Sequence, residues 1–126
     1  MDILSAPNAP AAVGPYSHAV RAGGFLFCSG QVGLDPETGA MVEGGVEAEA
    51  RQVFANIRAV LAAADLGLSD VVKATVFLST MEDFGRVNAV YAEAFGNHKP
   101  ARSTVAVAGL PVGAMVEIEV VAALGG

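Results

Sequence analysis

Arg102 is a charged residue in a position where the sequence is otherwise apolar. It follows Pro100 and Ala101 at the start of a predicted strand. A guanidinium presents planar, paired N–H donors that match the two oxygens of a carboxylate, so Arg102 is a candidate clamp for a small acid. The simpler alternative is a charge at a strand end that reaches solvent.

Two glutamates alternate with apolar residues near the end of the chain, in the run MVEIEVVAA. In a strand, this alternation places Glu117 and Glu119 on one face and Val116, Ile118 and Val120 on the other. The pair either belongs to a solvated polar face or supplies a carboxylate to a partly dry cleft. In the second case the carboxylate can hold and activate a water molecule.

Asn88 is a polar residue on the apolar stripe of a predicted helix, between Phe84 and Tyr91. A buried amide needs hydrogen-bond partners. It either contributes to a binding site or ties the helix to a neighbouring loop.

Other familiar sites are not indicated. His18, Cys28 and His98 are scattered and share no metal-binding motif. The sequence lacks the GxSxG elbow of many hydrolases, although residue order alone leaves a Ser-His-Asp triad open. It also lacks the GxGxxG and P-loop patterns of nucleotide sites, so no cofactor is expected. Cys28 lies in the apolar run FLFCS and is expected to be a small buried residue.

The elements that would position these side chains follow from hydrophobic periodicity and turn residues. Strands are predicted at residues 16–21, 25–29, 71–78, 102–108 and 114–123, and helices at 45–64 and 81–95. Gly23 and Gly24 suit a tight hairpin, and Thr80 can cap the second helix. Gly67 and Gly96 are predicted to end the helices. The order predicts one α+β domain over residues 1–126, with two helices on one face of a single sheet.

Composition limits the partners. Of the 126 residues, 53% are hydrophobic and only 16% are charged, against about 25% in typical soluble domains. The open sheet face is therefore expected to pack against other copies of the chain. A net charge of −6 argues against nucleic acid as a partner. With one cysteine, no signal peptide and no membrane-spanning run, a cytoplasmic location is expected.

These residues lie within motifs that resemble the RidA family, also called the YjgF or L-PSP family. The resemblance covers nearly the whole chain, including NAPAAVGPYSHAV at 8–20, FCSGQVGLDPETG at 27–39, PARSTVAV at 100–107 and VEIEVVAA at 116–123. It implies a chorismate-mutase-like protomer and a homotrimer with a central β-barrel and clefts between subunits. It also implies hydrolysis of 2-iminopropanoate and 2-iminobutanoate to 2-keto acids and ammonia, a metabolite-damage-control reaction that needs no cofactor or metal.

The resemblance assigns roles to individual positions. The residues that it places in the site are Arg102 for the carboxylate, Glu117 for catalysis, Tyr16, Ser29, Gly30, Asn88 and Thr104. Thr104 stands where many members have Cys, and its backbone is expected to matter more than its side chain. The short loop GNHK at 96–99 is a second departure, which is expected to alter substrate preference more than the reaction.

Two other functions share these features. A carboxylate-binding regulatory or chaperone-like protein would use the same arginine without turnover, but a glutamate in the same cleft would hinder simple carboxylate binding. A ribonuclease or translation inhibitor is the third alternative, and the acidic composition weighs against it.

Overall fold

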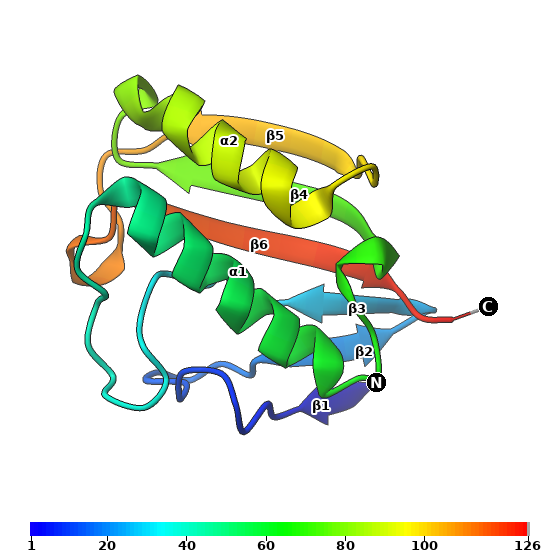
Figure 1. Ribbon diagram of the computed structural model, residues 1–126. Helices are drawn as coiled ribbons and strands as arrows, with labels where there is room; N and C mark the ends of the chain where they lie inside the picture. The colour runs from blue at the N-terminus through cyan, green and yellow to red at the C-terminus, as the bar shows by residue number, and fades with distance from the viewer. Residues whose placement is uncertain (126) are drawn as a thin grey trace.

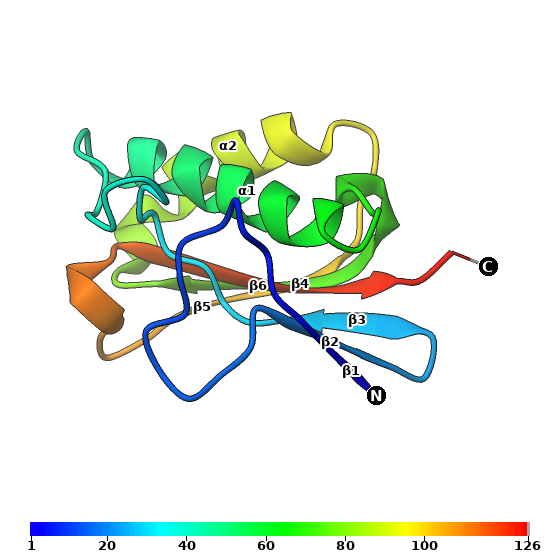
Figure 2. The ribbon, with the colours of Figure 1, turned by 90° about the horizontal axis from the view of Figure 1, so that it is seen from below.

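The computed structural model describes residues 1–125, which form a six-stranded sheet with two α-helices on one face (Figures 1 and 2). The strands are β1 (Asp2–Leu4), β2 (Ala19–Ala22), β3 (Phe25–Cys28), β4 (Val71–Leu78), β5 (Ala101–Ala106) and β6 (Val116–Ala123). The helices are α1 (Val46–Ala62) and α2 (Phe84–Phe95), with short 3-10 turns η1 (Leu68–Asp70), η2 (Met81–Asp83) and η3 (Pro111–Gly113).

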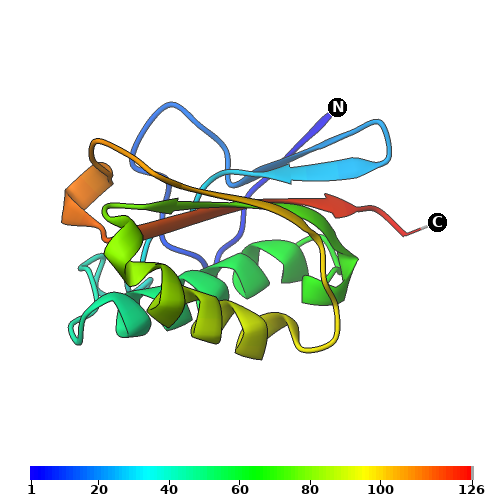
Figure 3. The same ribbon diagram turned by 90° about the horizontal axis from the view of Figure 1, so that it is seen from above.

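The sheet is mixed, with the strand order β1-β2-β3-β6-β4-β5. All neighbouring strands are antiparallel except β4 and β5, which are parallel and are joined through α2. A parallel pair needs such a crossover, and here the helix packs on the sheet face that it crosses (Figure 3). Strand β5 is thereby left at the edge of the sheet, and Arg102 lies at its start.

The core lies between the helices and the covered face of the sheet. Helix α1 buries Val53, Phe54 and Ile57 along its predicted stripe, and β6 contributes Val116 and Ile118. The alternation predicted for β6 is confirmed. Cys28 is also buried, as predicted, and burial raises the pKa of its thiol to about 12.

The predicted element order is confirmed, with one strand added at the start. Strand β1 pairs with β2 and has no pattern of its own in the sequence, because three residues are too few to show an alternation. Gly23 and Gly24 adopt the predicted positive φ values, 58° and 88°, and Gly96 ends α2 with φ 62°. Thr80 caps the short turn η2, which precedes α2.

Gly67 was predicted to end the first helix, and that prediction is wrong. Asp65 takes the left-handed conformation instead, with φ 60°. The amide of Leu66 donates to the Leu61 carbonyl over 2.9 Å, which closes the helix with the Schellman hydrogen bond. A short polar side chain such as Asp tolerates this conformation, so the chain turns two residues earlier than the glycine suggested.

The opposite face of the sheet is not covered by any element of residues 1–125. It exposes large apolar side chains, including Phe25 (41%), Phe27 (47%) and Val105 (43%). Within the described residues, neither helix combines the length and the apolar character that a membrane crossing requires.

Candidate active site

Arg102 is exposed but held in place. Its Nη1 donates a hydrogen bond of 2.7 Å to Oδ1 of Asn88 on α2. Its Cζ lies 4.7 Å from the ring centroid of Tyr91 and 5.7 Å from that of Phe84. Cation–π contacts at exposed sites contribute about 0.5–1 kcal/mol each. Among residues 1–125 no carboxylate pairs with this guanidinium, so most of its N–H donors remain available to a ligand.

Asn88 differs from the sequence prediction. Its amide was expected to be buried, but the side chain is exposed because it lies where α2 runs over the sheet edge. Its hydrogen-bond partner is Arg102 and not a loop. Asn88 and Arg102, which are far apart in sequence, are thus brought into direct contact.

Thr104 lies on the same face of β5 as Arg102, underneath α2. Its hydroxyl is buried and has no hydrogen-bond partner. A ligand therefore does not reach this hydroxyl directly, and the expected role of the Thr104 backbone stays a prediction.

Tyr91 also contacts Arg102, which the sequence pattern did not indicate. It was assigned only to the buried stripe of the second helix, yet its ring forms the support beneath Arg102. Burial raises the pKa of its hydroxyl, and the nearby positive charge of Arg102 opposes that shift. The available signal was its spacing: Phe84, Asn88 and Tyr91 lie four and three residues apart, which places them on one helix face.

Glu117 lies against Gly30 on the other side of the sheet. A Cβ at position 30 would overlap the Glu117 carboxylate, so only glycine fits there. The adjoining residue, Gln31, pairs with Ile118 of β6 through two backbone hydrogen bonds of 2.9 and 3.1 Å. Burial raises the pKa of Glu117, and the charge of Glu119 adds to that shift. A carboxylate whose pKa is raised is a better proton acceptor.

Ser29 adjoins Gly30, whereas Tyr16 belongs to a second segment that is hydrogen-bonded to Ser29. The Ser29 hydroxyl donates to the Ser17 carbonyl over 2.6 Å, and the Ser29 amide donates to the His18 carbonyl over 3.0 Å. These bonds attach the segment that carries Tyr16 to the segment that carries Gly30. The Tyr16 side chain is 49% exposed, so its ring is available to a neighbouring group.

His18 braces the N-terminal loop, a role that the sequence did not reveal. The amide of Ala6 donates to its Nδ1 over 2.9 Å, and its Nε2 lies 2.7 Å from the Pro10 carbonyl. These partners require a neutral ring that carries its proton on Nε2. The ring therefore fixes the path of the chain that leads to Tyr16.

The arginine and the glutamate point to opposite faces of the sheet. Cross-strand partners share a face, and Val76 pairs with both Thr104 and Ile118 on the covered side. Arg102 lies two residues before Thr104 and shares that side. Glu117 lies one residue before Ile118 and occupies the open side. One chain thus contains two candidate half-sites, Arg102 with Asn88 and Glu117 with Gly30.

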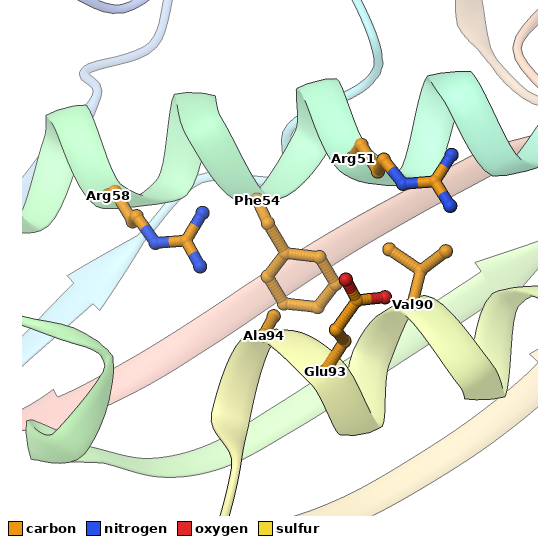
Figure 4. Close-up of a pocket in the computed structure, with 6 residues that line it drawn as sticks. All are labelled: Arg51, Phe54, Arg58, Val90, Glu93 and Ala94. Carbon is orange, nitrogen blue, oxygen red and sulfur yellow. The ribbon is translucent and has the colours of Figure 1, made fainter.

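Two depressions lie on the helical side of the molecule. One of about 300 Å³ is bordered by Arg102, Tyr91 and the 96–100 loop, so the shortened loop lies beside the guanidinium. Another, of about 260 Å³, lies between α1 and α2, where Arg51 and Arg58 extend on either side of Phe54 (Figure 4). None of the predicted site residues borders this second depression.

A mixed sheet covered by two helices, with a held arginine at its edge, defines a small α+β protein with a candidate acid-binding position. A family model described as Endoribonuclease L-PSP matches residues 6–124. The chain belongs to this family, which is also known as RidA.

Individual relatives cover almost the whole chain. The mouse protein named 2-iminobutanoate/2-iminopropanoate deaminase is 48% identical over 123 residues, 98% of this chain and 91% of the mouse chain. The crystal structure of RidA from an Antarctic Psychrobacter superposes with a TM-score of 0.94 at 44% identity, over 98% of this chain and 100% of that one. Escherichia coli TdcF with bound serine gives a TM-score of 0.93 at 38% identity, over 99% and 100%.

Proposed function

We propose that this protein hydrolyses 2-imino acids, such as 2-iminopropanoate and 2-iminobutanoate, to the 2-keto acid and ammonia. The observation that carries the proposal is the Arg102 guanidinium, which is oriented by Asn88 and two aromatic rings and yet keeps free donors. The name of the mouse relative and the serine bound to TdcF support a small substrate with a carboxylate beside a nitrogen-bearing carbon.

Arg102 binds the substrate carboxylate with two charge-assisted hydrogen bonds. The guanidinium is already ordered before the substrate arrives, so little side-chain freedom is lost on binding. This contact fixes the imine carbon relative to the sheet edge. Correct positioning of that carbon is a large part of what an enzyme can contribute to such an addition.

Glu117 activates the water. Its carboxylate accepts a proton as the water oxygen bonds to the imine carbon, and the C=N π electrons become a lone pair on nitrogen. Protons then pass to the nitrogen, the carbinolamine C–N bond breaks, and ammonia leaves as the C=O bond forms. The raised pKa of Glu117 suits it to accept and return the proton.

The remaining predicted residues shape the glutamate side of the cleft. Gly30 leaves room for the carboxylate, and its backbone can contact the adduct. The Ser29 hydroxyl already donates to Ser17, so it would receive a hydrogen bond from the adduct. Tyr16 would form an apolar wall and offer its hydroxyl.

The two half-sites meet between subunits of a homotrimer. Because Arg102 and Glu117 lie on opposite faces of one sheet, a complete site needs Arg102 of one chain and Glu117 of another. The exposed phenylalanines of the open face support its packing against other copies, as in a central β-barrel. A cytoplasmic role in removing reactive imines fits this reaction.

In the direct test, an amino-acid-oxidising enzyme generates 2-iminobutanoate in situ. The formation of 2-ketobutyrate is then measured with and without the protein. The protein should accelerate this step well above the buffer rate. Saturable binding of 2-ketobutyrate without any acceleration would instead indicate the carboxylate-binding regulatory function. The endoribonuclease description of the family receives no support from the net charge of −6.

A further inference from the structure

Two buried hydroxyl groups line a small cavity beneath Arg102. Oη of Tyr91 and Oγ1 of Thr104 are both buried and both lack a hydrogen-bond partner among the described residues. Both residues border the same cavity, together with Asn88 and Arg102. Buried side-chain oxygens are nearly always paired, so two unpaired hydroxyls around one cavity indicate a missing partner.

The size of the cavity decides what the partner is. Its volume is about 10 Å³, close to the minimum of about 10–15 Å³ that one water molecule needs. The rest of the wall is apolar, formed by Val76, Leu78, Phe84 and Val87. 2-Iminopropanoate, with six non-hydrogen atoms, does not fit there.

We propose that this cavity holds one ordered water molecule, which joins the hydroxyl of Tyr91 to that of Thr104. Asn88 also borders the cavity, and its amide nitrogen is the candidate third partner because its Oδ1 accepts from Arg102. Three hydrogen bonds are the usual number for a buried water.

The bridging water would hold the Tyr91 ring in position beneath the Arg102 guanidinium. The ring of Tyr91 lies 4.7 Å from the guanidinium carbon, and Thr104 belongs to the same strand face as Arg102. The water therefore ties the ring beneath the arginine to the strand that carries it. Tyr91 and Thr104 are positioning residues in this view, since each acts through Arg102. Their effect on catalysis rests on the proposed function.

Isosteric substitutions test the bridge. Tyr91→Phe keeps the ring beneath Arg102 and removes only the hydroxyl, and Thr104→Val does the same for the threonine. Each should weaken 2-ketobutyrate binding and raise KM for 2-iminobutanoate by about three- to tenfold, with kcat nearly unchanged. This pattern is expected because the carboxylate contact weakens equally in the ground state and in the transition state. Thr104→Ser, which keeps a hydroxyl, should stay close to wild type.

The double variant is the decisive measurement. Since both hydroxyls act through one water, Tyr91→Phe with Thr104→Val should weaken binding no more than the worse single variant. Losses that multiply, or a Kd unchanged in all variants, would overturn the proposal. Binding of 2-ketobutyrate is measured by calorimetry, so the result stands even if the protein does not hydrolyse imines.

A crystal structure that resolves waters gives an independent check. The expected result is one density peak within hydrogen-bond distance of Tyr91 Oη and Thr104 Oγ1, absent from the double variant. A dry cavity, or a direct bond between the two hydroxyls, would contradict the proposal.

Discussion

The two faces of the sheet differ in how completely the chain covers them. On the covered face, α1 and α2 bury a continuous apolar layer, and Arg102 is held by Asn88 and by two aromatic rings of the same chain. On the open face, Glu117 is only half-buried, and Phe25 and Phe27 are more than 40% exposed. The covered face is complete in one chain, whereas the open face lacks a partner.

This difference separates two kinds of functional residue. Arg102, the proposed acid-binding residue, is held by packing within the protomer, so its geometry is present before any assembly. The glutamate is positioned by Gly30 and β6, but its environment would become dry only when another surface covers it. Variants of the two candidate half-sites are therefore expected to fail in different ways.

Removing the clamp should have the largest effect. Arg102→Ala is expected to lower kcat/KM for 2-iminobutanoate by at least about 100-fold, since each charge-assisted hydrogen bond contributes about 1.5–3 kcal/mol. Arg58→Ala removes an exposed arginine from the depression between α1 and α2 (Figure 4). It is the matched control, and its activity is expected to be near wild type. Equal losses in both variants would show a general charge effect.

Changing the base should reduce turnover and leave binding intact. Glu117→Gln is expected to lower kcat by about 100-fold or more, the usual contribution of a general base. Binding of 2-ketobutyrate should persist, because Arg102 is unchanged. If that binding fell as much as turnover, Glu117 would be a binding residue, and the proposed division of labour would be wrong.

A charge on the open face should disturb assembly without unfolding the protomer. Phe27→Asp places a carboxylate on this face and leaves the core beneath the helices intact. The dissociation constant of the assembly should rise by at least about tenfold, which corresponds to 1.4 kcal/mol, and activity should become dependent on protein concentration. Met81→Asp alters an exposed apolar side chain outside the sheet and should leave sedimentation unchanged.

The smallest predicted effect is a change in pH dependence. The charge of Glu119 helps to raise the pKa of Glu117, so Glu119→Gln should lower that pKa. The base form then survives to lower pH, and the acidic limb of the kcat/KM profile moves toward lower pH. Glu37→Gln, in a distant exposed turn, is the control. A limb that moves to higher pH would mean that another group controls it.

The sequence alone predicted the order of the elements and the layers better than the spatial relation of the candidate residues. Periodicity revealed both helices and the alternation around Glu117, because burial imposes those patterns directly. The contacts of Tyr91 and His18 were not predicted, since an aromatic residue on a helix stripe looks the same whether or not it supports a cation. The opposite orientation of Arg102 and Glu117 depends on the register of β4 with β5 and with β6. Such pairing between distant segments leaves no local pattern in the sequence.

Subunit complementation tests the central claim most directly. Arg102→Ala and Glu117→Gln chains, each nearly inactive alone, are co-expressed with different tags and purified as mixed assemblies. If each site takes its arginine and its glutamate from different chains, one of the three sites in every mixed trimer regains both residues, so about a third of the wild-type activity should return. Mixed assemblies that remain as inactive as the separate variants would contradict the account.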